Sequence, residues 1–271
     1  MPLSFSQLSL YQRCPKQYEF ANVKKLPRSI SAGESFGSSM HNALARFGKQ
    51  ELLVTRYALR EAQVAMFAEE QKAPCTTLND VIDYWHQSFI VQGYDSKKDM
   101  EAARSRGETI ITQFYEWWST RERQVLAIEK GFKLSLDGGL ELSGRFDRVE
   151  QVGGGLHVID YKTSGVRTQE EVDNDLQLSV YALACDEVFG QPCVSLSFLF
   201  LREDGITEVV TKRSAQELKE AVDQIASTEE GIVQKLFDPT PSVQICTHCP
   251  YKNVCSAAWT TSPPVPLSSA K

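Results

Sequence analysis

Apolar residues recur at helical spacing through the first 125 residues of the chain. Within residues 35–48, for example, the pattern places Phe36, Met40, Leu44 and Phe47 on one helical face. A shorter helix begins at a Ser6 cap, runs through Tyr11 and ends near Cys14. We expect further helices over residues 51–70, 78–90 and 99–120.

The hydrophobic period then changes from helical spacing to alternation. The alternating segments predict strands over residues 125–136, 140–152, 156–162, 194–201 and 206–212. Glycine-rich turns at residues 137–139 and 153–155 separate the first three. Helices are expected over residues 170–189 and 214–236. This order predicts an α/β fold, a mixed sheet flanked by helices, with an N-terminal helical insertion.

We expect one domain over residues 1–258. It would comprise an N-terminal arm (1–34), a helical region (35–124), a core (125–237) and a cysteine-rich segment (238–258). Residues 259–271 contain mostly Ser, Pro, Ala and Thr, a composition typical of a disordered tail.

Composition narrows the class of protein. The chain has 271 residues, 42% hydrophobic and 24% charged, which excludes disordered and collagen-like proteins. Its net charge of −6 argues against gripping duplex DNA by bulk positive charge, but an acidic metal site could still act on nucleic acid. We find neither a bilayer-spanning apolar run nor a signal peptide in the sequence, so we expect a cytoplasmic protein with reduced cysteines and no membrane partner.

Two predicted strands carry acidic residues in apolar surroundings. Asp147 lies in Gly-Arg-Phe-Asp-Arg-Val, and Asp160 in Val-Ile-Asp-Tyr-Lys-Thr-Ser. Antiparallel pairing would bring the two carboxylates to one end of the sheet, and Lys162 would share a strand face with Asp160. Such a group suits Mg²⁺. In the alternative interpretation, Asp147 pairs with Arg145 or Arg148 and Lys162 is a solvated strand end.

These two strands, together with one helical motif upstream and one downstream of them, resemble the RecB-like branch of the PD-(D/E)xK nucleases, which includes CRISPR-associated exonucleases. The helical motifs are Gly37-x-x-x-His41 and Gln177-x-x-x-Tyr181. The resemblance implies a restriction-endonuclease-like fold and Mg²⁺ or Mn²⁺ bound by His41, Asp147, Asp160 and the Tyr161 carbonyl. It further implies Asp147, Asp160 and Lys162 as catalytic residues, with Gln177 and Tyr181 shaping the site or contacting DNA. Glu129 either approaches the site or is an exposed strand residue.

The implied activity is hydrolysis of DNA phosphodiester bonds. Resemblance favours an exonuclease that acts on single strands or ends and leaves 5′-phosphates, in DNA repair or recombination. A helicase P-loop is absent from the sequence, so any motor would be a separate protein; a helicase and CRISPR-adaptation proteins are the further candidate partners. An iron–sulfur DNA-binding or assembly subunit with little nuclease activity is the alternative.

The cysteines form a second motif. Cys246, Cys249 and Cys255 leave a tetrahedral metal one ligand short, which His248 or Cys14 could supply, and four thiolates suit either zinc or a [4Fe–4S] cluster. The division into one N-terminal and three C-terminal cysteines resembles the iron–sulfur staple of AddB-type subunits, which implies a [4Fe–4S] cluster on Cys14, Cys246, Cys249 and Cys255. We interpret Cys75, Cys185 and Cys193 as ordinary buried thiols.

Overall fold

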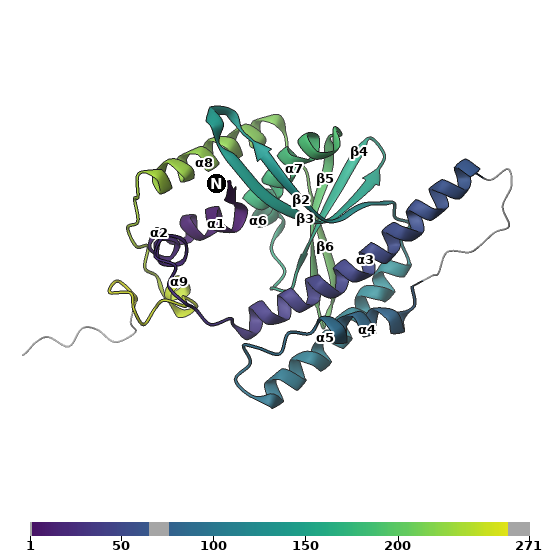
Figure 1. Ribbon diagram of the computed structural model, residues 1–271, viewed down its shortest axis with the longest axis horizontal. Coiled ribbons are helices and arrows are strands. Elements are labelled where there is room, and N and C mark those ends of the chain that lie inside the picture. The colour runs from purple at the N-terminus through teal and green to yellow at the C-terminus, as the bar shows by residue number, and fades with distance from the viewer. Residues whose placement is uncertain (1, 65–75, 260–271) are drawn as a thin grey trace, which may run out of the picture. The chain divides into compact units, whose positions relative to one another are not determined.

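The computed structural model describes residues 2–64 and 76–259, and the chain divides into two compact units (Figure 1). The terminal unit combines Met1–Ser29, Leu136–Leu142 and Val222–Lys271. The central unit combines Ile30–Ser135 and Ser143–Ala221. Among the described helices, we find none with the length and apolar character needed to cross a membrane.

The sheet has six strands, most of whose residues belong to the central unit. These are β1 (Leu3–Ser4), β2 (Val125–Ser135), β3 (Glu141–Val152), β4 (Gly155–Lys162), β5 (Cys193–Arg202) and β6 (Gly205–Thr211). Their order is β1-β3-β4-β5-β6, and β2 also pairs with β3. β3 and β4 are antiparallel, β4 and β5 parallel, and β5 and β6 antiparallel. The predicted mixed sheet is therefore confirmed, with β1 as an additional short strand.

Three long helices pack together in the central unit: α3 (Ala32–Val64), α4 (Leu78–Ser88) and α5 (Lys97–Ser119). The predicted apolar stripe of α3 is buried in one core cluster with Trp85, Phe114 and Ile159. Residues 35–48 and 51–70 do not form two helices, because α3 continues through Lys49 and Gln50, which both favour helix. The predicted residues 65–70 and Cys75 lie outside the described part of the chain.

The crossover from β4 to parallel β5 contains two helices where one was predicted. α6 (Gln169–Asp173) ends before Asp175, and the Asp175 carboxylate then caps α7 (Leu176–Phe189) by accepting the Gln177 main-chain N–H at 2.8 Å. The break follows from the preference of Asp for helix N-caps. It places Gln177 in the first turn of α7.

The terminal unit is built from short helices. α1 (Phe5–Arg13) is capped by Ser4, which forms a capping box with Gln7, and not by the predicted Ser6. α2 (Pro15–Tyr18) and the π-helix η1 (Glu19–Val23) follow, and the short 3-10 helix η2 (Asp137–Gly139) forms the predicted hairpin turn. α8 (Ala215–Val233) begins in the central unit, and α9 (Val243–Thr247) lies within the cysteine-rich segment.

Hydrogen bonds hold the C-terminal segment against the N-terminal arm inside the terminal unit. The Tyr11 hydroxyl donates to the Leu236 carbonyl at 2.6 Å, and the Thr240 hydroxyl donates to the Arg13 carbonyl at 2.7 Å. Tyr11 and Tyr18 also pack against Phe237. Cys14 therefore lies beside the segment that carries the other three cysteines of the motif.

Candidate metal centre and catalytic site

Pairing of β3 with β4 brings the two acidic motifs together. Arg148 pairs with Ile159, so one further step of this register leads to Asp147 and Asp160. There, the main-chain N–H of Tyr161 donates to Oδ2 of Asp147 at 3.0 Å. Asp147 is 7% exposed and Asp160 2%. Both carboxylates are therefore withdrawn from water, which is costly for a charge unless it is paired or binds a cation.

His41 reaches Asp147 from helix α3. Its Nδ1 lies 3.1 Å from Oδ2 of Asp147. The neighbouring stripe residues Met40 and Leu44 are fully buried, which fixes this part of α3 against the core. Burial lowers the pKa of His41, but the hydrogen bond and charge of Asp147 outweigh it and the pKa is raised. The Asp147 carboxylate therefore shifts the imidazole toward its protonated form relative to a free histidine.

Glu129 completes a group of three candidate ligands. One ligand atom each from His41, Glu129 and Asp147 lies within 4.8 Å of the others. Glu129 is in β2 at φ 51°, a conformation uncommon for a residue other than glycine and found at functional sites. Burial and the charge of Asp147 raise the pKa of Glu129. The alternating pattern left its role open because this backbone turn within a strand carries no hydrophobic signal.

Asp160 is held by a separate set of side chains from α7 and β4. Its Oδ1 accepts hydrogen bonds from the Tyr181 hydroxyl at 2.9 Å and the Gln177 side-chain amide at 2.8 Å. Its Oδ2 lies 2.7 Å from Nζ of Lys162 as an ion pair but has no well-aligned hydrogen bond among the described residues. Burial and the charge of Asp147 raise the pKa of Asp160, while Lys162 opposes them.

Gln177 links Lys162 to this acid. Lys162 Nζ donates to Oε1 of Gln177 at 2.8 Å, and the amide of the same Gln177 donates to the Tyr181 oxygen at 2.9 Å. The Tyr181 hydroxyl also lies 3.1 Å from the Arg145 carbonyl. Gln177 and Tyr181 thus lie on one face of α7, and their contacts fix the position of both the acid and the lysine.

The charge balance of the site fits a hard divalent cation. Three carboxylates, Glu129, Asp147 and Asp160, stand against the cations Lys162 and Arg145, with an imidazole beside them. The Asp160 Oδ2 that lacks a well-aligned hydrogen bond is a further available ligand atom. Oxygen ligands with one imidazole suit Mg²⁺ or Mn²⁺.

The alternative pairing of Asp147 with Arg148 or Arg145 does not occur. Arg148, 2% exposed at the side chain, contacts Glu51 of α3 at 2.5 Å and Glu150 at 2.6 Å. Arg145 pairs with Glu129 at 2.7 Å. A buried ionic network that the sequence did not predict therefore joins β3 to α3. Asp147 has His41 as its neighbour instead of an arginine.

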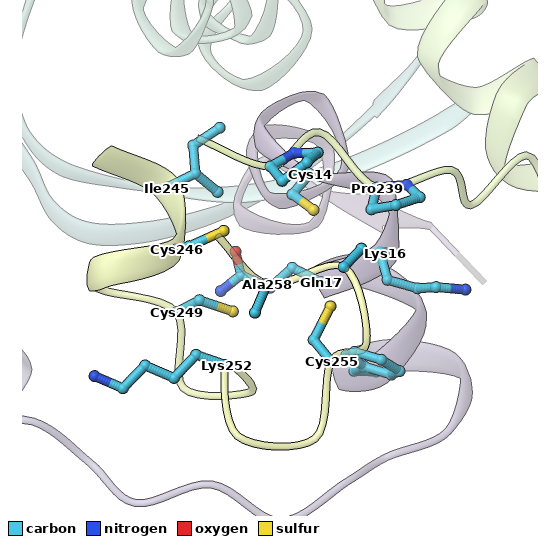
Figure 2. A pocket seen from close by; sticks show the side chains of 13 residues that line it. Cys14, Lys16, Gln17, Pro239, Ile245, Cys246, Cys249, Lys252, Cys255 and Ala258 are labelled. Atoms are coloured by element: carbon cyan, nitrogen blue, oxygen red, sulfur yellow. The ribbon is translucent and has the colours of Figure 1, made fainter. Parts of the chain in front are cut away.

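The four cysteines of the motif line one cavity of the terminal unit, and their sulfur atoms point into it (Figure 2). His248 is not among the lining residues. Burial raises the pKa of the Cys14 thiol, but N–H groups of Thr240, Gln17 and Lys16 and the Thr240 hydroxyl outweigh it and the pKa is lowered. The lowered pKa shifts Cys14 toward the thiolate, which is the form that binds metals.

The spacing of these sulfur atoms can be compared with that of a tetrahedral zinc site. Tetrahedral zinc with Zn–S bonds of about 2.3 Å places its sulfur ligands about 3.8 Å apart. Within the described residues, no three of these sulfurs lie within 4.8 Å of one another. Cys185 is fully buried and Cys193 partly buried, and Cys193 donates to the Ser195 carbonyl.

The mixed sheet with clustered acids, histidine and lysine is the arrangement of a metal-dependent nuclease family. The model of the PD-(D/E)XK nuclease superfamily matches residues 2–256, and the chain belongs to this superfamily. Its members use divalent metals to hydrolyse phosphodiester bonds.

Similar proteins come from mycobacteriophages. The Gene 69 protein of Mycobacterium phage D29 is 28% identical over 277 residues, which cover 94% of this chain and 97% of the relative. The Gene 69 protein of Mycobacterium phage L5 is 29% identical over 211 residues, 68% of this chain and 70% of the relative. A candidate exonuclease from Eubacterium rectale has the same fold, with a TM-score of 0.52, 11% identity and coverage of 96% of this chain and 91% of that one.

Proposed function

We propose that the protein is a metal-dependent deoxyribonuclease whose active site lies at the end of β3 and β4. The observation that carries the proposal is the grouping of His41, Glu129 and Asp147 beside the buried Asp160–Lys162 pair. A bound Mg²⁺ or Mn²⁺ would polarise a phosphodiester and lower the pKa of water. In this proposal His41, Asp147, Asp160 and the Tyr161 carbonyl hold the metal, and Glu129 joins them.

The other residues act by position and charge. Lys162 orients the attacking water or offsets the charge that develops on phosphorus, and its bond to Gln177 aims the ammonium group. Tyr181 and Gln177 hold one oxygen of Asp160, which leaves the second oxygen for a cation. The preorganised acid and lysine support hydrolysis over simple DNA binding.

We further propose exonuclease action on DNA single strands or ends, in repair or recombination. The exonuclease resemblance of the Gly37–His41 and Gln177–Tyr181 motifs supports this preference, as does the modest basic content of the chain, 29 Lys and Arg residues against 35 Asp and Glu. The aromatic residues near Cys14, which are Tyr11, Tyr18 and Phe20, are buried in the terminal unit, so we expect contacts with unpaired bases to come from other residues.

The activity is tested with end-labelled single-stranded and double-stranded DNA and with closed circular single strands, in Mg²⁺ or Mn²⁺. An exonuclease shortens the linear strands and leaves the circles intact, whereas cut circles would show endonuclease action. Lys162→Ala should lose about 10²–10⁴-fold in rate. Asp160→Asn, which keeps the shape of the buried side chain, should be inactive. Cleavage by folded Asp160→Asn at the wild-type rate would reject the proposed site.

For the terminal unit we propose a [4Fe–4S] cluster on Cys14, Cys246, Cys249 and Cys255. The shared cavity, into which the four sulfur atoms point, and the lowered pKa of Cys14 support it. Such a cluster would join the N-terminal arm to the C-terminal segment and thereby constrain the unfolded chain.

Metal analysis of anaerobically purified protein tests the cluster. We expect a brown protein with iron and sulfide in equal amounts, lost in Cys14→Ser and retained in the matched control Cys185→Ser. A colourless protein that contains stoichiometric zinc would contradict the cluster and indicate a zinc site. Nuclease assays of the same preparations would then show whether the group affects activity or only stability.

A further inference from the structure

Two cavities of the central unit lie beside the residues that follow the catalytic lysine. Their volumes are about 370 Å³ and 530 Å³, within the range of ligand pockets, and Arg106 and Glu203 line both. The first is also lined by Phe36, Thr163 and the hairpin residues Arg202 and Asp204. Helices α3 and α5 and the β5–β6 hairpin thus meet around one hollow.

This hollow is close to the proposed active site, both along the chain after β4 and along helix α3. Thr163 directly follows Lys162. Phe36 is five residues before His41 in α3, which is about 7.5 Å along a helix axis. That separation is comparable to the distance between neighbouring phosphates of an extended DNA strand. A strand bound for hydrolysis would therefore have an adjoining nucleotide near these cavities.

The two arginines at the hollow differ in their partners. Arg202 is bound by both oxygens of Asp204, at 2.8 and 3.1 Å. Arg106 is exposed, its guanidinium carbon lies 4.1 Å from the centroid of the Phe36 ring, and it forms no ion pair with a described carboxylate. Stacking on a buried ring restrains the side chain while its N–H donors stay available. Arg106 is therefore the cation of this hollow that is free to meet an anion.

We propose that Arg106 binds a backbone phosphate of a DNA single strand next to the phosphodiester that is cut. The inference rests on the proposed nuclease function and adds a substrate subsite to it. A guanidinium suits phosphate because its N–H groups match the phosphate oxygens. Asp99 lines the second cavity and Asp204, paired with Arg202, lines the first, whereas Glu203 is the carboxylate that lines both, so we expect it to weaken binding of the strand.

Substitution of Arg106 and substitution of Glu203 should therefore change the affinity for single-stranded DNA in opposite directions. Binding of a fluorescent single-stranded oligonucleotide is measured by anisotropy across a salt series, without divalent metal so that it is not cut. Arg106→Ala should weaken binding and reduce the slope of log K against log salt by about 0.7, the value for one phosphate contact with a single strand. Arg106→Lys should keep the slope, and Glu203→Gln should tighten binding.

Arg121→Ala is the matched control. Arg121 also stacks on an aromatic ring, with its guanidinium carbon 3.8 Å from the Trp117 centroid, but it lines neither cavity. An unchanged salt slope in folded Arg106→Ala, an Arg121→Ala effect of equal size, or no binding by the wild type would overturn the subsite. If the wild type binds as expected but cuts no DNA, the nuclease proposal fails while the Arg106 result stands.

Discussion

Nδ1 of His41 and Oδ2 of Asp147 lie 3.1 Å apart, although the two residues come from a helix and a strand more than 100 positions apart in the chain. The same carboxylate oxygen accepts the main-chain N–H of Tyr161. Strands β3 and β4 and helix α3 are thus joined at one atom. Glu129 approaches this point from a third strand, and its other neighbour is the guanidinium of Arg145.

Arg145 is therefore expected to compete with a metal ion for Glu129. Its side chain is 65% exposed while Glu129 is 15% exposed, so the arginine covers a buried acid from the solvent side. Arg145→Ala removes a cation from the site and should tighten Mn²⁺ binding several-fold. Isothermal titration of Mn²⁺ measures this directly, with Arg121→Ala as control. Weaker Mn²⁺ binding in Arg145→Ala would mean that the arginine positions Glu129 for the metal instead.

Removal of the Tyr181 hydroxyl tests whether its hydrogen bond positions the Asp160 carboxylate. Tyr181→Phe keeps the ring packed against Phe146 and Phe132 but loses the bond to Oδ1. Partners that orient metal ligands are typically worth about 10–100-fold in metal affinity or activity, and we expect a loss in that range. Ser179→Ala, a change on the same helix, is the control. Equal rates for Tyr181→Phe and the wild type would assign the hydroxyl to packing alone.

The sequence was sufficient to predict most strands and the apolar stripe of α3, because alternation and helical spacing directly reflect which face is buried. The sequence was insufficient where a local capping preference or a polar stretch competes with the hydrophobic pattern. The amphipathic pattern from Glu170 to Phe189 predicts one helix, yet Asp175 interrupts it by capping α7. The continuity of α3 through Lys49 was missed for the opposite reason, since a polar stretch can mark either a loop or a solvated helical turn.

The candidate site likewise contains residues that the sequence predicts and residues that only the tertiary structure places there. Linear motifs predicted site roles for His41, Asp147, Asp160, Lys162, Gln177 and Tyr181, and the structure brings all six into two contacting groups. The position of Glu129 depends on strand pairing and on a positive φ, neither of which leaves a periodic signal. Likewise, the buried network of Arg148 with Glu51 and Glu150 depends on how α3 crosses β3.

A hydrogen-bonded chain across three strands makes part of the sheet's stability depend on pH. The Ser197 hydroxyl donates to Glu208 at 3.0 Å, and His157 lies 3.5 Å from the same carboxylate. Burial raises the pKa of Glu208, but the hydrogen bonds from His157 and Ser197 outweigh it and the pKa is lowered.

A carboxyl with a lowered pKa stabilises the folded state above its unfolded pKa, and this contribution is lost as the pH falls through the folded value. The free energy of unfolding of the wild type should therefore exceed that of Glu208→Gln at pH 7, and the difference should shrink as the pH falls below about 4.3, the ordinary value for Glu. Urea melts of both proteins at pH 7, 5 and 3 measure it. A difference that is constant with pH would contradict the assignment.

Two glycines with opposite surroundings give a matched test of the helical packing. A Cβ added at Gly107 in α5 would lie 1.9 Å from the Trp85 ring, and that ring is fully buried with its indole N–H bonded to the Arg104 carbonyl at 2.9 Å. Because neither α5 nor Trp85 can move freely, Gly107→Ala should lower the free energy of unfolding by about 1–3 kcal/mol. At Gly33 in α3 the added Cβ would meet nothing within 4 Å, so Gly33→Ala should raise it by up to about 1 kcal/mol through helix propensity. Urea denaturation of the two variants measures both values, and a Gly107→Ala protein as stable as Gly33→Ala would show that α4 and α5 do not pack as described.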